Sequence, residues 1–341
     1  MKKRTLNNNG RYKRLATIAL TGLMVLSNVC TISAAESDGS AKILPDYESY
    51  EETLRTGEKL NIELMSEGAV LLKNDNSALP LSSSELNVTV FGLTSVHLVY
   101  GGSGSGGGTV TDDMEQADLY DGLEQAGFNT NKVVKQFYEA QNYEEQNPYA
   151  SSAEVVETDP ALLEDYIDSY KAYGDAAIVV FGRTGGEMSD RPRSGIDGDP
   201  DTHYLELVEN EKNLLEHVEK YFDKVIVLIN SSNVMELGIL EDDDKVDSIL
   251  WIGGTGINGT IAIGRILNGE VNPSGRLVDV YMADMKKDPT WFNSGDLSQF
   301  YTGEDTYANQ LAAMYAEGSD TAWNPSEEAG EYDIYTVLEY N

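Results

Sequence analysis

The chain has 341 residues, of which 40% are hydrophobic and 24% charged, and its formal net charge is -34. These proportions exclude a disordered or collagen-like chain and leave room for one large domain or two modest ones. The first 35 residues contain no Asp or Glu, so the remainder is still more acidic. Such a surface repels nucleic acid, nucleotides and anionic lipid, whereas a neutral ligand meets no such barrier.

The first 35 residues have the order of an export signal. A basic stretch ending at Arg14 is followed by an apolar run from Leu15 to Val29 and then by small residues. We expect cleavage after Ala34 or Ala35, and a secreted or cell-surface protein with no membrane contact after cleavage. An uncleaved N-terminal anchor is the alternative, because the run is only slightly shorter than a spanning helix.

The following segments alternate between helical and strand patterns. Helical patterns cover about residues 45–67, 119–126, 132–140, 162–173, 204–222 and 257–267, and apolar strand patterns cover residues 69–72, 88–92, 177–181, 225–229 and 246–252. Strands that are apolar on both faces and alternate with helices predict an α/β fold, with a mostly parallel sheet sandwiched by helices. We expect the runs at 177–181 and 225–229 to lie centrally in that sheet.

Domain limits follow from the same patterns. The α/β domain is expected over residues 36–285. Residues 286–341 contain Tyr and Trp but lack periodicity, so we expect them to form an irregular connector.

Ligand sites in parallel sheets gather in the loops at the carboxyl ends of strands. The two polar loops that begin at Gly101 and Gly182 follow predicted strands, so they are the first candidates for a site.

The glycine-dense loop Gly101–Gly108 admits three interpretations. It can cradle phosphate, approach a neutral ligand, or serve as a linker. No Gly-Lys-Ser/Thr follows it, and the acidity of the chain disfavours an anion. We favour a mobile loop that approaches a neutral ligand.

Metal binding has little support in the sequence. No spacing typical of metal ligands relates the three histidines, which are His97, His203 and His217. The run Asp197–Asp201 resembles the start of a calcium loop, but Thr202 and Val208 replace the Gly and Glu that such a loop needs. The single cysteine, Cys30, lies in the export signal, and no Gly-x-Ser-x-Gly motif indicates a serine hydrolase. We therefore expect no metal and no cofactor.

The sharpest local signal is the glycine-containing loop Gly182–Arg191, which follows an apolar strand directly and carries Glu187 just after two glycines. A carboxyl group lifted into a cleft at the end of a strand acquires a raised pKa, which a general acid requires. Arg191, next to Asp190, is expected to hold the loop or to bind ligand hydroxyls. Taken alone, the pattern also fits an exposed loop carboxylate.

Several motifs, in the same order, resemble the C-terminal α/β domain of glycoside hydrolase family 3, the family of β-glucosidases and β-xylosidases. They are Glu67–Asn74 with Leu79-Pro80-Leu81, Gly101–Gly106, Gly185-Gly186-Glu187 with Asp190-Arg191, Val246–Trp251, and Gly269 with Asn272–Leu277. The resemblance covers roughly residues 45–284 and implies a helix–sheet–helix sandwich.

The resemblance also implies roles for individual residues. Glu187 occupies the position of the family's acid/base glutamate, although Met188 replaces the second glycine of that loop. The remaining implied contacts to the substrate come from Gly102, Ser103, Gly104, Ser105, Asp190 and Arg191. The implied substrate is a neutral oligosaccharide or β-glycoside, and the nucleophilic Asp of the family lies on a separate (β/α)8 barrel domain.

The domain order resembles a subgroup in which the α/β domain precedes the barrel, so we expect the chain to be a fragment that stops before the barrel. Retaining hydrolysis needs both carboxylates, so we expect the chain alone to be inactive. Three hypotheses follow. The chain is the acid/base half of an exported retaining β-glycosidase, a non-catalytic exported module that binds carbohydrate or a partner, or a degenerate pseudoenzyme.

Overall fold

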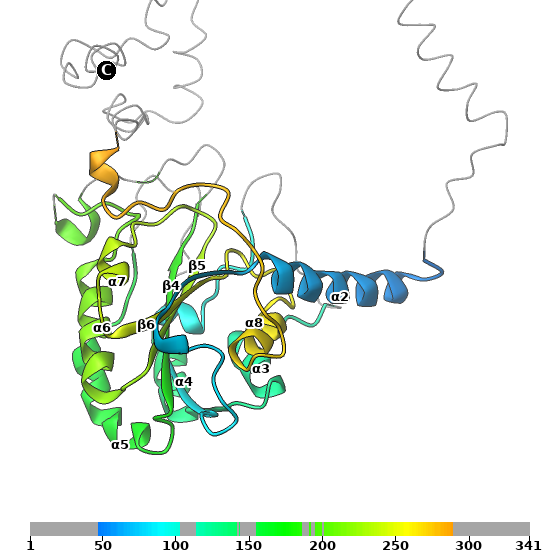
Figure 1. Ribbon diagram of the computed structural model, residues 1–341, viewed down its shortest axis with the longest axis horizontal. Helices are drawn as coiled ribbons and strands as arrows, with labels where there is room; N and C mark the ends of the chain where they lie inside the picture. The colour runs from blue at the N-terminus through cyan, green and yellow to red at the C-terminus, as the bar shows by residue number, and fades with distance from the viewer. Residues whose placement is uncertain are drawn as a thin grey trace, which may run out of the picture. The chain divides into compact units, whose positions relative to one another are not determined.

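The computed structural model describes residues 47–102, 114–141, 143, 155–185, 191, 195–199 and 201–288 (Figure 1). The chain divides into two units, residues 1–53 and residues 54–341. The sheet belongs to the second unit, and the predicted export signal lies outside the described residues. None of the helices within the described ranges combines the length and the apolar character needed to cross a membrane.

Helices and strands alternate along the described residues, as the sequence predicts. The helices are α2 (Tyr50–Gly68), α3 (Leu119–Gln125), α4 (Lys132–Glu139), α5 (Ile167–Tyr170), α6 (Glu209–Tyr221), α7 (Gly238–Glu241) and α8 (Thr260–Leu267). The strands are β1 (Val70–Asn74), β2 (Asn87–Phe91), β3 (Asn129–Thr130), β4 (Ala176–Arg183), β5 (Val225–Ser231) and β6 (Val246–Trp251). Among the short 3-10 turns, η2 (Leu93–Ser95) follows β2 and η4 (Pro160–Tyr166) precedes α5.

The six strands form one sheet in the order β1-β6-β5-β4-β2-β3. Every pairing is parallel except that of β1, which lies antiparallel to β6 at the edge. The chain leaves β2 for β3 on one side and returns to β4 on the other, so the strand order reverses between β2 and β4. In open parallel sheets such a switch point is where ligands bind, outside the carboxyl ends of the strands.

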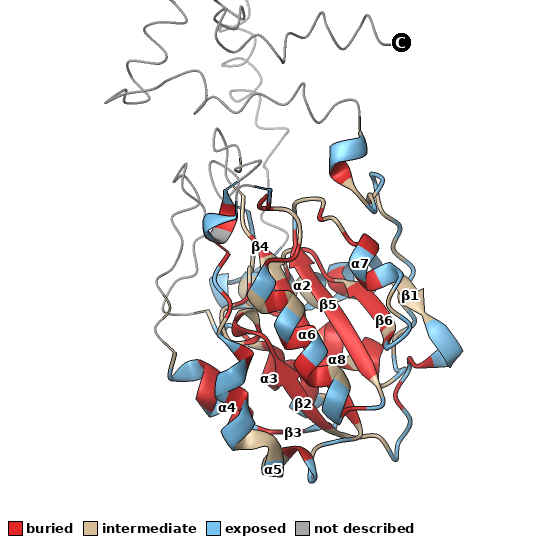
Figure 2. Cartoon of the chain, turned by 90° about the vertical axis from the view of Figure 1, so that its left-hand side faces the viewer, coloured by how far each residue is buried: buried red, intermediate tan, exposed pale blue. Residues whose placement is uncertain are grey.

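Helices cover both faces of the sheet, which confirms the predicted fold class. Successive residues of β4 point to opposite faces: Val179 packs in the cluster formed with α4, α5 and α6, and Ile178 packs in the cluster formed with α3 and α8. Figure 2 shows the buried strands between helices whose outer faces are exposed. Strands β4 and β5 are central, and residues Val225 to Ile229 are fully buried.

Two boundaries differ from the prediction for physical reasons. Strand β4 continues to Arg183 instead of ending before Gly182, because the guanidinium finds a buried partner in Glu211. Helix α6 begins at Glu209 instead of near Tyr204. The side chain of Glu211 accepts the backbone N–H of Val208 at 3.0 Å, which satisfies a donor at the helix start.

Candidate active site

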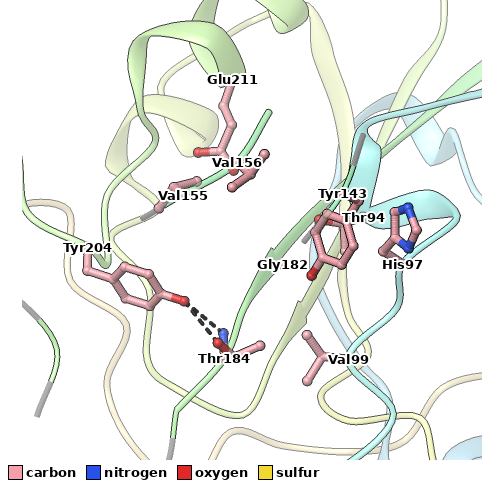
Figure 3. Close-up of a pocket in the computed structure, with 10 residues that line it drawn as sticks. All are labelled: Thr94, His97, Val99, Tyr143, Val155, Val156, Gly182, Thr184, Tyr204 and Glu211. Atoms are coloured by element: carbon pink, nitrogen blue, oxygen red, sulfur yellow. Dashed lines mark hydrogen bonds between the residues drawn. The ribbon is translucent and has the colours of Figure 1, made fainter. Parts of the chain in front are cut away.

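A small cavity of about 40 Å³ lies at the switch point between β2 and β4 (Figure 3). Its lining residues are Thr94, His97, Val99, Tyr143, Val155, Val156, Gly182, Thr184, Tyr204 and Glu211. Most of these side chains are neutral hydroxyl, imidazole or aliphatic groups, and the one carboxylate, Glu211, is paired with Arg183. The chemistry of the lining suits a neutral, hydroxyl-bearing group or water.

His97 offers a polar atom on the side of this cavity where Tyr143 lies. The two rings stack with centroids 3.9 Å apart and an angle of 13° between their planes. Burial lowers the pKa of His97, so its imidazole is neutral near pH 7. Its Nε2 atom has no hydrogen-bond partner among the described residues.

At the wall of the cavity, Glu211 forms a buried ion pair with Arg183. Nη1 of Arg183 donates to Oε1 of Glu211 at 2.7 Å, and Nη2 donates to Oε2 at 2.6 Å. The remaining guanidinium hydrogens reach backbone carbonyls, including that of Tyr204 from Nε at 2.6 Å. This two-pronged geometry fixes the end of β4 relative to the start of α6.

A second buried carboxyl group, Glu157, lies near this pair. Burial raises its pKa to about 8, and the charge of Glu211 adds to the effect, while bonds from two backbone N–H groups and the charge of Arg183 oppose it. One of those N–H groups belongs to Leu93, which follows β2, at 3.0 Å from Oε2. Glu157 is therefore mostly protonated at pH 7 and ties the turn after β2 to the segment before α5.

The segment that leads into the glycine loop is fixed by one amide side chain. Asn230, which is fully buried near the end of β5, accepts the N–H of Val99 at 2.6 Å and donates to the carbonyl of Val99 at 2.9 Å. It also donates to the carbonyl of Gly253 at 2.7 Å. Three residues further along, Asn233 donates to the carbonyl of Thr184 at 3.0 Å. Both candidate loops are thus fastened to the segment that leaves β5.

Most of the predicted site residues lie outside the described residues: Ser103, Gly104, Ser105, Glu187 and Asp190. Their predicted roles stay predictions. Of the glycine loop Gly101–Gly108, only Gly101 and Gly102 are among the described residues, and both are exposed. The guanidinium of Arg191 lies over the ring of Tyr204, 5.1 Å from its centroid.

One cluster brings together possible metal ligands that sequence spacing does not reveal. Atoms of His203, Glu206 and Glu236 lie within 4.8 Å of one another. Nδ1 of His203 accepts the N–H of Leu205 at 3.2 Å, so Nε2 carries the proton and faces Glu236 at 3.2 Å. The ammonium of Lys286 lies 3.8 Å from Glu206. These contacts fit a hydrogen-bonded cluster without a metal.

Sequence reasoning missed four residues that shape this region: Glu157, Tyr204, Asn230 and Asn233. Asn230 had a weak signal, because it directly follows the apolar run Val225–Ile229, and a polar residue in a buried strand needs a hydrogen-bond partner. The other three lie in loops, and their partners are distant along the chain. No periodic pattern marks them.

Comparison with protein families gives one family over most of the chain. The model of the glycosyl hydrolase family 3 C-terminal domain matches residues 69–322. Among curated proteins, β-glucosidase A of Butyrivibrio fibrisolvens is 34% identical over 266 residues, which cover 73% of this chain and 31% of that protein. A β-glucosidase of Ruminococcus albus is 31% identical, over 74% of this chain and 25% of that protein.

Solved structures agree. β-Glucosidase 3B from Thermotoga neapolitana, in complex with glucose, matches with a TM-score of 0.59 and 28% identity, over 73% of this chain and 34% of that one. A β-glucosidase from Paenibacillus barengoltzii matches with a TM-score of 0.57 and 28% identity, over 70% of this chain and 26% of that one. The chain spans about a quarter to a third of the length of these relatives.

Proposed function

The chain belongs to glycosyl hydrolase family 3, and we propose that it is the acid/base-bearing α/β domain of a retaining β-glycosidase that hydrolyses O-glycosyl bonds. The observation that carries this proposal is the place where β4 ends. The described residues Thr184 and Gly185 leave the sheet at its switch point, beside a cavity with a neutral, hydroxyl-rich lining, and Glu187 follows two residues later.

In the proposed mechanism, Glu187 first protonates the leaving-group oxygen of the glycoside. An Asp of a (β/α)8 barrel domain attacks the anomeric carbon and forms a glycosyl-enzyme. Glu187 then removes a proton from the water that hydrolyses this intermediate. Retaining chemistry needs the two carboxyl groups about 5–5.5 Å apart, so the barrel and this domain must meet at the loop.

Substrate contacts are proposed for both loops at this edge. The backbone and hydroxyl groups of Gly102–Ser105 approach the sugar, and Asp190 and Arg191 lie near its hydroxyls. The strong net negative charge is compatible with such a ligand, because a neutral glycoside is not repelled. The relatives named above are β-glucosidases, so a β-glucoside is the first substrate to test.

Export is part of the proposal. The basic-apolar-small order of residues 1–35 supports cleavage near Ala35 and action outside the cell or on its surface. N-terminal sequencing of exported material is expected to begin close to residue 36. Material that begins at Met1 would instead indicate an uncleaved anchor.

The test uses the longer protein in which this chain is joined to its barrel. Glu187→Ala is expected to slow hydrolysis of β-glucosides with poor leaving groups about a hundredfold or more. Aryl glycosides with activated leaving groups need little protonation, so their glycosylation step is expected to slow much less. Glu58→Ala, which alters an exposed carboxylate of α2, is the matched control and should leave both rates unchanged. Wild-type rates of Glu187→Ala on cellobiose-like substrates would refute the assignment.

A further inference from the structure

Thr184 and Arg191, which lie on either side of residues 186–190 in the sequence, both contact one tyrosine, Tyr204. The hydroxyl oxygen of Tyr204 accepts the backbone N–H of Thr184 at 3.1 Å and lies 3.2 Å from the hydroxyl of the same residue. At the other end, the guanidinium of Arg191 lies 5.1 Å from the centre of the Tyr204 ring. Figure 3 shows the tyrosine reaching across to Thr184.

Tyr204 is itself held firmly. Its side chain is 2% exposed and packs with Val155, Ile196 and Val208. Its backbone carbonyl accepts the 2.6 Å bond from Arg183, whose guanidinium also lies 5.7 Å from the ring. A tyrosine fixed in this way provides a rigid support rather than a mobile contact.

Asn233 supports the start of the same segment from the opposite direction. Its side chain donates to the carbonyl of Thr184 at 3.0 Å, and its own backbone N–H is bonded to the hydroxyl of Ser231 at 3.0 Å. Gly185 packs so closely on Asn233 that a Cβ there would lie 2.6 Å from the amide oxygen. The N–H and the carbonyl of Thr184 are therefore both occupied, which sets the direction in which the chain leaves β4.

We propose that Tyr204 is a positioning residue for Glu187: its hydroxyl fixes Thr184, three residues before Glu187, and its ring contacts Arg191, four residues after it. This inference rests on the proposed acid/base role of Glu187. A general acid must lie within hydrogen-bond reach of the leaving-group oxygen, and a displacement of about 1 Å can cost about a hundredfold in rate. Contacts that fix Thr184 and Arg191 narrow the set of positions open to Glu187, which is the basis of the proposed role.

The first experiment tests the anchor in the 341-residue chain without reference to catalysis. Tyr204→Phe removes the hydroxyl and keeps the ring, so the Thr184 amide should exchange with deuterium about five- to tenfold faster, the worth of one hydrogen bond. Tyr170→Phe is the matched control, because it removes another buried hydroxyl, bonded to His217 at 3.1 Å. The control should leave the Thr184 amide unchanged. Equal exchange in wild type and Tyr204→Phe would overturn the anchor.

The second experiment uses the protein joined to its barrel. Tyr204→Phe should lower kcat/KM about five- to tenfold for β-glucosides with poor leaving groups and by less than about twofold for activated aryl glucosides. In a Glu187→Ala background the same change should cost nothing further. Equal losses on both substrate classes, or full additivity with Glu187→Ala, would contradict a positioning role.

The two experiments separate the inference from its premise. If Glu187→Ala has no effect by itself, the proposed function fails, and with it the role of Tyr204 toward Glu187. The exchange rate of the Thr184 amide still decides whether Tyr204 anchors the loop. If Glu187→Ala is slow but Tyr204→Phe matches wild type on every substrate, the proposed function stands and the positioning role is wrong.

Discussion

The two faces of the sheet are stabilised by different kinds of contact. On the face covered by α4, α5 and α6, ionisable side chains are buried among apolar ones: Glu157, Arg183, Glu211 and His217. On the face covered by α3 and α8, the helices approach closely through Gly122 and Gly264, each of which packs against backbone of the other helix. One face relies on paired charges and the other on close backbone contact.

This difference between the two faces corresponds to which candidate loop each face supports. Buried charge is expensive unless it is paired and bonded, so proteins keep it where it fixes something specific. Here the pair of Arg183 and Glu211 fixes the end of β4 to the segment that contains Tyr204. The loop that carries Glu187 follows β4 directly in the sequence. The glycine-packed face holds the segment before the other candidate loop with neutral groups, because Leu98 and Tyr100 pack in its cluster and the amide of Asn230 bonds Val99. The comparison teaches that the buried charges of Arg183 and Glu211 hold the residues next to the candidate acid/base loop in place, and do not only fill the core.

The largest effect is expected from breaking the buried pair. Arg183→Met leaves the carboxylate of Glu211 buried without its partner, which should cost about 3–5 kcal/mol of unfolding free energy. Urea denaturation of the 341-residue chain measures this. Arg265→Met is the control, because Arg265 is partly exposed and lies 3.9 Å from Glu270; it should cost less than about 1 kcal/mol.

A double variant sharpens this prediction. Arg183→Met combined with Glu211→Leu removes both charges, so part of the lost stability should return. A single Arg183→Met variant that unfolds at the wild-type urea concentration would show that the pair does not hold this face together.

The second prediction concerns pH and Glu157. Its pKa in the folded protein is raised to about 8 from an ordinary value near 4.5. Below pH 4.5 both the folded and the unfolded chain carry the proton, and the contribution to stability is fully present. Between pH 4.5 and 8 only the folded chain keeps it, so unfolding free energy falls with rising pH, by up to about 1.4 kcal/mol per unit. Above about pH 8 the loss is complete.

Comparison with Glu157→Gln isolates this group. The amide keeps an acceptor for the N–H of Leu93 but does not titrate, so the stability of wild type relative to the variant should fall from pH 6 to 8 and then level off. His217, whose pKa burial lowers, and Glu219, whose pKa burial raises to about 7, are present in both proteins and cancel. Parallel stability curves for the two proteins would refute a protonated Glu157.

The third prediction tests the glycine-packed face. Gly122→Ala would place a Cβ against the backbone carbonyl of Thr260, and the helices must separate to admit it. We expect a loss of about 1–3 kcal/mol, with no change in how stability depends on pH. Gly57→Ala is the control, because nothing lies within 4 Å of that position in α2, and it should be neutral or stabilising by up to about 1 kcal/mol. Equal stability of the two variants would contradict close packing of α3 and α8.

Much of this architecture was predictable because it depends on local patterns. The apolar runs that became β4 and β5 indicated buried central strands, and the alternation with helices indicated a parallel sheet. Strand β3 escaped prediction because two residues carry no periodicity. The residue Arg183 suggested the start of a loop, since a charged side chain is buried only with a partner, and Glu211 lies 28 residues away.

The candidate site, like the fold, was only partly predictable from the sequence. Motifs with recognisable order, such as Gly185-Gly186-Glu187, located the loop by resemblance. The side chains that hold its ends were not predictable, because Tyr204 and Asn233 reach Thr184 from 20 and 49 residues away. Such contacts depend on how the strands are ordered, which sequence patterns alone do not specify.

The most direct test of the acid/base assignment is rescue by azide in the protein joined to its barrel. Glu187→Ala should accumulate the glycosyl-enzyme from an activated aryl β-glucoside, because no base helps water to attack. Azide attacks without a base, so it should restore turnover and yield a β-glycosyl azide in Glu187→Ala but not in wild type. Unchanged slow turnover with azide, and no glycosyl azide product, would contradict the account.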